Sequence, residues 1–308
     1  MKRRKFIKTG LLASAIPTIG GIIYGSSIKN SNIKKDPFNL LYAPHFGMFT
    51  NHSGNDLVDQ IQFMYDMGFR SFEDNGMKER SITDQKRIAK IMNKLEMTMG
   101  VFVAHKIHWD FPNLTSGDKE YQDQFVNDIK DSIEVAKRVN AKWMTVVPGY
   151  IDLGKEMAYQ TANVIEALRR ASDVLEPHGL VMVLEPLNWW KNHAGQFLRE
   201  IPQAYEICRA VNSPSCKILF DIYHQQISEG NLIPNIDKAW KEIAYFQIGD
   251  NPGRKEPTTG EINYKNIFKH IYEKKYKGVL GMEHGNSKSG KPGELAVIDA
   301  YRAVDSFL

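Results

Sequence analysis

Eight short apolar runs alternate with amphipathic stretches along most of the chain, and this alternation limits the possible folds more than any other feature. The runs cover residues 39–43, 69–72, 98–103, 143–147, 180–184, 217–220, 244–248 and 278–282. Between them, apolar residues recur three and four positions apart, which is typical of amphipathic helices. Strands that alternate with helices in this way predict a parallel sheet.

Eight strand–helix units favour a closed (β/α)8 TIM barrel over an open sheet. No glycine-rich dinucleotide-binding fingerprint follows the first run, where the sequence reads His45-Phe46-Gly47-Met48. An open doubly wound sheet is the alternative. One barrel domain over residues 36–308 accounts for the length of the chain. The chemistry of such barrels gathers at the C-terminal ends of the strands, so the residue after each run is a candidate site residue.

Residues 1–35 read as an export signal and linker. The pair Arg3-Arg4, followed by Phe6 and Lys8, resembles the twin-arginine signal pattern, and an apolar run over residues 11–24 comes next. A proline and two glycines make this run a poor membrane helix. The pattern predicts export to the periplasm, with a membrane contact only through the signal if it is not cleaved. An ordinary basic arm is the alternative.

Charge and cysteine content exclude several classes of partner. Five lysines and arginines lie within the first eight residues, and removing them from the net charge of +4 leaves −1. A nearly neutral body gives no electrostatic reason to expect nucleic acid or an anionic membrane as a partner. Cys208 and Cys216 are too few for a disulfide framework, and we interpret both as buried small side chains.

Four consecutive predicted strands in the second half end in oxygen-bearing side chains. These are Glu185, Asp221, Gln247 and Glu283. A carboxylate at the end of an apolar strand is costly unless it is paired or binds a metal ion, and three on one rim repel one another. One cation relieves that repulsion, and an oxygen-rich ligand set favours Mn²⁺ or Mg²⁺. Each residue taken alone could instead be a helix cap or a salt-bridge partner.

Dense motifs occur between residues 180 and 285. They read Glu185-Pro186-Leu187-Asn188, Gly195-Gln196-Phe197-Leu198, Asp221-Ile222-Tyr223-His224-Gln225, Gln247-Ile248-Gly249-Asp250 and Asn251-Pro252-Gly253-Arg254, continuing through Glu261-Ile262-Asn263-Tyr264. Together they resemble the hydroxypyruvate isomerase family of the xylose isomerase-like barrels, whose patterns are E-P-x-N, P-G-x-F-L, D-I-Y-H-x-Q and Q-I-A-D-x-P-G-R. Residues 278–283 resemble the family's Y-x-G-x-x-G-x-E. The first half of the chain matches only in its alternation of predicted strands and helices.

The resemblance implies specific roles. It assigns Glu185, Asp221, Gln247 and Glu283 as metal ligands, and Glu185 and Glu283 also as the acid/base pair. It places His224 and Arg254 against the substrate. The implied reaction is the isomerisation or epimerisation of a small hydroxy-carbonyl compound, through an enediolate that the metal stabilises. A packing role for His224 and a solvated charge for Arg254 stay open.

Several strand ends depart from the family's pattern. His45 follows the first strand, and the third strand is followed by His105, His108 and Trp109. These side chains predict contacts with a substrate larger than a three-carbon acid, such as a sugar or keto-sugar. Packing behind the site is the alternative.

Two other functions are compatible with the sequence. A metal-dependent lyase or hydrolase could use the same barrel, although a histidine-rich endonuclease site is disfavoured because Gln247 stands where a histidine ligand is common. A non-catalytic exported sugar-binding barrel is the other, but it would not need both Glu185 and Glu283. The expected partner is a small sugar-like molecule, and a homo-oligomer is left open.

Overall fold

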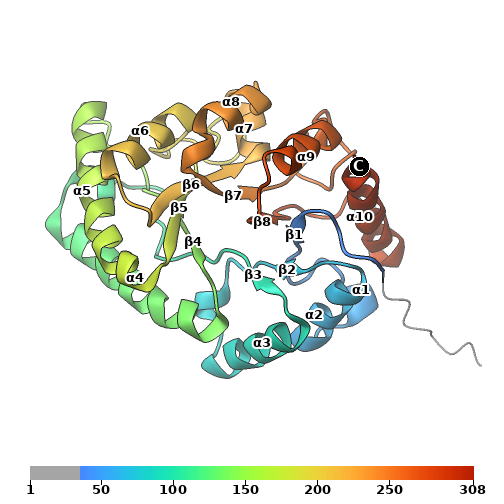
Figure 1. Cartoon of the computed structure of the whole chain (residues 1–308). Coiled ribbons are helices and arrows are strands. Elements are labelled where there is room, and N and C mark those ends of the chain that lie inside the picture. The colour runs from blue at the N-terminus through green and yellow to red at the C-terminus, as the bar shows by residue number, and fades with distance from the viewer. Residues whose placement is uncertain (1–34) are drawn as a thin grey trace, which may run out of the picture. The chain divides into compact units, whose positions relative to one another are not determined.

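The computed structural model describes residues 35–308, in which eight parallel strands alternate with helices as the sequence predicts (Figure 1). The predicted export signal lies outside these residues, apart from its last position. The strands are β1 (Leu41–Ala43), β2 (Ser71–Phe72), β3 (Thr98–Met99), β4 (Trp143–Val146), β5 (Val181–Leu184), β6 (Cys216–Asp221), β7 (Ile243–Gln247) and β8 (Val279–Gly281).

The strands close into a barrel. Six of them form one sheet in the order β1-β8-β7-β6-β5-β4, and β2 pairs with β3. The gap between β1 and β2 is closed where the Glu73 N–H donates to the Pro44 carbonyl at 3.0 Å. The gap between β3 and β4 is closed by a parallel bridge between Val103 and Thr145. An open doubly wound sheet is therefore excluded.

Helices surround the strands (Figure 1). They are α1 (Thr50–Ser53), α2 (Leu57–Asp66), α3 (Ile82–Leu95), α4 (Lys119–Val139), α5 (Met157–Leu175), α6 (Ile201–Val211), α7 (Ile222–Ser228), α8 (Leu232–Ala239), α9 (Tyr264–Glu273) and α10 (Gly290–Asp305). Side-chain caps begin several of them; Asn263, for example, accepts from the Asn266 N–H at the start of α9. Within residues 35–308, none of the helices combines the length and hydrophobicity needed to cross a membrane.

Alternation along the strands divides the buried side chains into two groups. On β5, Met182 and Leu184 belong to the large core that includes most helices, whereas Val181 and Val183 belong to a small separate cluster. The small cluster also holds Leu219 and Tyr245. Successive strand residues face opposite sides, so the small cluster fills the barrel interior beneath the rim.

Gly281 on β8 makes room for a charged residue inside this interior. Glu73, which follows β2, is 1% exposed, and its Oε2 accepts a hydrogen bond of 2.8 Å from the Tyr245 hydroxyl. A Cβ at position 281 would overlap the Glu73 carboxylate. The absence of a side chain on β8 is therefore what allows a carboxylate from β2 to enter the barrel.

Gly281→Ala should lower the free energy of unfolding by about 1–3 kcal/mol, because overpacking a closed interior forces neighbouring side chains away from their preferred rotamers. Urea unfolding followed by circular dichroism measures this. Gly154→Ala is the control, since a Cβ there would meet its nearest neighbour at 3.4 Å, which is ordinary contact. Equal midpoints for the two variants would contradict this description of the interior.

Candidate active site

The strand ends bring the four predicted oxygen-bearing residues to one rim. Asp221, the last residue of β6, pairs in register with Gln247, the last residue of β7, and Gln247 pairs with Gly281 of β8. Glu185 follows β5 directly, and Glu283 lies two residues beyond β8. Glu185, Asp221 and Gln247 are buried, and the Glu283 side chain is 26% exposed.

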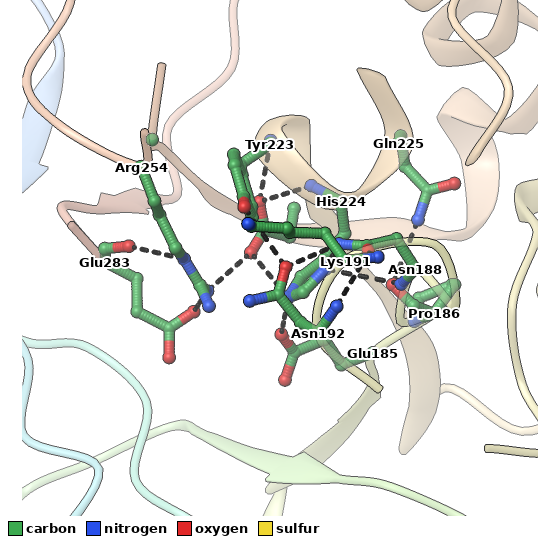
Figure 2. A network of polar contacts seen from close by, with 12 residues as sticks. Glu185, Pro186, Asn188, Lys191, Asn192, Tyr223, His224, Gln225, Arg254 and Glu283 are labelled. Carbon is green, nitrogen blue, oxygen red and sulfur yellow. Dashed lines mark hydrogen bonds and ion pairs between the residues drawn. The ribbon is translucent and has the colours of Figure 1, made fainter. Parts of the chain in front are cut away.

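Arg254 joins two of these carboxylates. Its Nη2 donates to Glu283 Oε2 at 2.6 Å and to Asp221 Oδ2 at 3.2 Å, and its Nε donates to the Glu283 carbonyl at 3.1 Å (Figure 2). Burial alone lowers the pKa of Arg254, but the charges of Glu283 and then Asp221 outweigh it and raise the pKa above its ordinary value. Arg254 therefore stays charged and belongs to the site, rather than being a solvated loop charge.

The loop between β7 and α9 is shaped by Asp250, which the sequence analysis did not single out as a functional residue. Its buried carboxylate accepts from the N–H groups of Asn251, Gly260 and Ile262 at 2.9, 2.9 and 3.1 Å. The Arg254 N–H in turn donates to the Asp250 carbonyl at 2.8 Å. The aspartate thus folds the loop that carries Arg254 to the rim; its position three residues beyond β7 indicates that it lies near the rim, but not that it holds this loop.

The imidazole of His224 is oriented by Asn188. Both the side-chain Nδ2 and the backbone N–H of Asn188 point at His224 Nδ1, at 2.6 and 3.3 Å. The Asn188 Oδ1 accepts from the N–H groups of Lys191 and Asn192 at 3.0 and 3.2 Å, so the amide cannot be reversed (Figure 2). Nδ1 is therefore an acceptor, and a neutral imidazole carries its proton on Nε2.

The Nε2–H of His224 is directed at the carboxylates. Nε2 lies 3.6 Å from Asp221 Oδ2 and 3.8 Å from Glu185 Oε1, and it has no hydrogen-bond partner within the described part of the chain. Burial, and then the charge of Arg254, lowers the pKa of His224 well below its usual value. Although these three residues lie close enough to hold a metal ion, a protonated nitrogen cannot be a ligand, so His224 serves as a hydrogen-bond donor.

The donor set fits a divalent metal ion. The amide oxygen of Gln247, Oε1, is buried without a hydrogen-bond partner among residues 35–308, and an orphaned acceptor of this kind needs an explanation. Burial raises the pKa of Asp221 and of Glu283, and burial followed by the charge of Glu283 raises the pKa of Glu185. Glu185, Asp221, Gln247 and Glu283 together offer the oxygen atoms that a hard cation prefers.

Two further residues that the sequence analysis did not assign support the rim from β2. Glu73 lies beneath it, and burial followed by the charge of Glu283 raises the pKa of Glu73 well above its usual value. Asn75 donates from Nδ2 to Glu283 Oε1 at 2.9 Å. Both follow the predicted strand at residues 69–72, which places them at the same rim, but no family motif covers them, so their contacts with the other rim residues could not be assigned from the sequence.

A pocket of about 240 Å³ opens beside the carboxylates. Its walls include Glu185, Glu283, His224, Arg254 and Trp109. Of the other residues predicted to contact substrate, His45 lines a neighbouring cavity of about 260 Å³ that shares Asn75 and Glu283 with this pocket. The remaining two, His105 and His108, are not among the residues that line either of these two cavities.

His105 and His108 pack against neighbouring side chains. His105 is buried, accepts from the Val147 N–H at 3.3 Å and meets Phe125 edge to face. Burial lowers the pKa of His105 to about 4, so the ring is neutral. His108 lies against Phe111, with ring centroids 4.4 Å apart. These contacts favour the packing alternative for both histidines.

Known proteins share this barrel fold. The family model for the xylose isomerase-like TIM barrel matches residues 61–306. The chain belongs to this family. Hydroxypyruvate isomerase of Escherichia coli K12 is 29% identical over 258 residues, which are 80% of this chain and 94% of the relative.

Two more proteins are similar to this chain, one in sequence and one in fold. A 2-oxo-tetronate isomerase of Pectobacterium atrosepticum is 32% identical over 157 residues, covering 51% of this chain and 60% of the relative. The crystal structure of a 3-keto-D-glucoside 4-epimerase from E. coli superposes with a TM-score of 0.70 at 17% identity, covering 86% of this chain and 98% of that chain. The second similarity shows the fold alone.

His224 should be observed as the neutral Nε2–H tautomer at pH 6.5, the ordinary pKa of a histidine, because its folded pKa lies well below that value. Long-range ¹H–¹⁵N correlation spectra of ¹⁵N-histidine-labelled protein distinguish the tautomers. The chain has 9 histidines, and comparison with a His224→Asn spectrum assigns the signal. A proton on Nδ1 would show that Asn188 does not fix the ring.

Proposed function

We propose that this barrel is a metal-dependent isomerase or epimerase of a small hydroxy-carbonyl compound of the sugar type. The observation that carries the proposal is that Glu185 and Glu283 both line one pocket, while the buried Oε1 of Gln247 at the same rim has no hydrogen-bond partner in the described chain. Its sequence relatives are isomerases by name. The names of these relatives and of the epimerase with the same fold refer to hydroxy-carbonyl compounds, which supports the same substrate class here.

Glu185, Asp221, Gln247 and Glu283 would hold the ion, with Mn²⁺ or Mg²⁺ as our first choice. When bound, the ion supplies Lewis acidity toward a carbonyl and an adjacent hydroxyl. Three carboxylates that share one low-dielectric rim need a positive charge, and Arg254 alone does not balance them. An ion held by these ligands would thus supply the positive charge that the three carboxylates need.

The two glutamates would carry the protons. Glu185 leaves β5 and Glu283 leaves β8, so β6 and β7 stand between them in the sheet. Two groups separated in this way reach a central substrate from different directions. Burial raises the pKa of both carboxyls, so each takes up a proton more readily than an exposed glutamate, which suits a general acid–base pair.

His224 and Arg254 would bind oxygens of the substrate. The Nε2–H of His224 has no partner in the described chain and faces the pocket. Arg254 reaches the pocket on a loop that Asp250 folds. Both are donors, and donors aimed at a developing oxyanion lower the barrier to removing the neighbouring carbon proton.

Export by the twin-arginine route is a separate part of the proposal. It depends on Arg3-Arg4 and the apolar run that follows, which are sequence features outside the described residues.

Metal binding should depend on the charge of Asp221. Wild-type protein loaded with Mn²⁺ should hold about one ion and gain about 2.7 kcal/mol of stability at a hundredfold excess over Kd. Asp221→Ala should lose both the ion and the cap that Asp221 gives the N–H groups of Tyr223 and His224. Asp221→Asn is the matched control, because it keeps a capping oxygen while removing the charge.

Elemental analysis and thermal melts with and without Mn²⁺ measure these effects. Asp221→Asn should melt near the metal-free wild type and show no shift on adding metal. Wild-type protein that takes up no divalent ion would rule out the metal site.

Glu185→Gln and Glu283→Gln should each retain some metal but lose about 10²–10⁴-fold in turnover, since a positioned acid or base contributes about that much. If the enzyme is an epimerase with one base on each face, either variant should still exchange one substrate proton with D₂O without inverting the centre. If it is an isomerase with one base, one variant should lose exchange entirely.

Deuterium incorporation followed by NMR, with metal content checked in parallel, measures this difference. Wild-type turnover of the substrate in both metal-loaded variants would make a lyase, a hydrolase or a binding protein the better account.

A further inference from the structure

Three residues that line the pocket each carry a buried polar atom that has no partner in the described chain. These atoms are Asn75 Oδ1, Thr145 Oγ1 and His224 Nε2. The first is an acceptor, the second is both donor and acceptor, and the third is a donor. Buried polar atoms are normally paired, so unpaired ones that face a cavity indicate the ligand that completes them. Alcohol hydroxyls, which both donate and accept, complement all three.

The charges around the pocket are already matched. Arg254 is the only permanent cation among the residues that line it, and it pairs with Glu283 and Asp221. If one divalent ion is bound, it and Arg254 together balance the three carboxylates; without the ion, the carboxylates are in excess. The neighbouring cavity contains Arg80, but this side chain pairs with Asp74. In neither state does a cation remain for an anionic group of the substrate.

An aromatic wall runs from the mouth of the pocket to His224. Trp109, whose surface is 47% exposed, stacks on His193 with centroids 5.0 Å apart and an interplanar angle of 24°. His193 in turn lies 5.4 Å from His224. The Trp109 carbonyl accepts from Gln196 Nε2 at 3.0 Å, which ties the wall to the loop after β5. These contacts therefore hold the wall in place as part of the pocket.

We propose that the substrate is an uncharged cyclic sugar whose ring lies against Trp109 and whose hydroxyls bind Thr145 and Asn75. The proposal rests on the proposed function, because it takes the same pocket as the substrate site. The C–H bonds on one face of a sugar ring are apolar and pack against the negative face of an indole. A keto acid would place a carboxylate where no free cation meets it, at the cost of burying an unpaired charge.

Isothermal titration of Mn²⁺-loaded protein with a matched pair of ligands tests the proposal. The pair is methyl 3-keto-glucoside and the same compound with a carboxylate in place of its primary alcohol, with hydroxypyruvate as a third ligand. The neutral glycoside should bind about tenfold or more tightly than either acid, the factor for about 1.4 kcal/mol. An acid that binds as tightly as the neutral sugar would overturn the proposal.

Two variants locate the ring. Trp109→Ala should weaken binding of the glycoside by about tenfold, whereas Trp190→Ala should leave it unchanged, because Trp190 is 72% exposed and does not line the pocket. Thr145→Val should weaken binding while leaving the unliganded protein as stable or more stable, since it removes an unpaired buried hydroxyl. Equal effects of the two tryptophan variants, or a loss of stability in Thr145→Val that accounts for the loss of binding, would contradict the assignment.

Deuterium exchange into the bound glycoside keeps the two proposals apart. A neutral sugar that binds with the predicted variant pattern but never exchanges its carbon protons would overturn the isomerase function and leave the substrate class standing. Exchange into hydroxypyruvate in preference to the glycoside would overturn the substrate class and leave the isomerase function standing.

Discussion

Repulsion among carboxylates at the rim of a closed barrel is the constraint on which the site depends. Closure brings Glu185, Asp221 and Glu283 to one edge, and burial raises the pKa of each. A folded chain can tolerate this only with positive charge nearby. Arg254 supplies part of it, and the unpaired Oε1 of Gln247 offers a ligand for a cation that would supply the rest. The repulsion that folding creates among these carboxylates is thus the same property that favours binding of a cation at the site.

A metal ion and Arg254 compete for the same oxygen atoms. Arg254 contacts Asp221 and Glu283 directly, and both carboxylates belong to the ligand set that we assign to the metal. A cation held between them would loosen the arginine's hydrogen bonds, so that its N–H groups reach a neutral hydroxyl or carbonyl oxygen while its charge still offsets the carboxylates. The flexible stem of Arg254 leaves the barrel on a loop rather than a strand, which gives the side chain room to adjust while the strand ends stay fixed.

The fold and the gathering of oxygen-bearing side chains at the ends of β5 to β8 were predictable from the sequence because they depend on local pattern. Short apolar runs mark strands, and the barrel rule places whatever follows them at one rim. Glu73 and Asn75 follow the second predicted strand, so the same rule places them at the rim, but no motif assigns them a role; their place in the site depends on closure between β1 and β2. Asp250 is hidden for another reason: its carboxylate binds backbone N–H groups, which no sequence pattern displays.

In the segment after β3, the sequence does not show which individual side chains face the pocket. Its composition indicates contacts near the pocket, but irregular backbone has no fixed period, so the sequence could not tell Trp109 from His105 and His108. Only the fold shows that Trp109 faces the pocket while His105 turns toward Phe125.

Gly281 has a consequence for how sequences of this kind can change. The space that its missing side chain leaves is filled by the carboxylate of Glu73, so the two positions are coupled although 208 residues apart in the chain. A chain that gains a side chain at position 281 has no room for glutamate at position 73. A chain with a shorter residue at position 73 has a void there, which glycine at position 281 cannot fill. A substitution at one of these two positions is therefore tolerated only together with a matching substitution at the other.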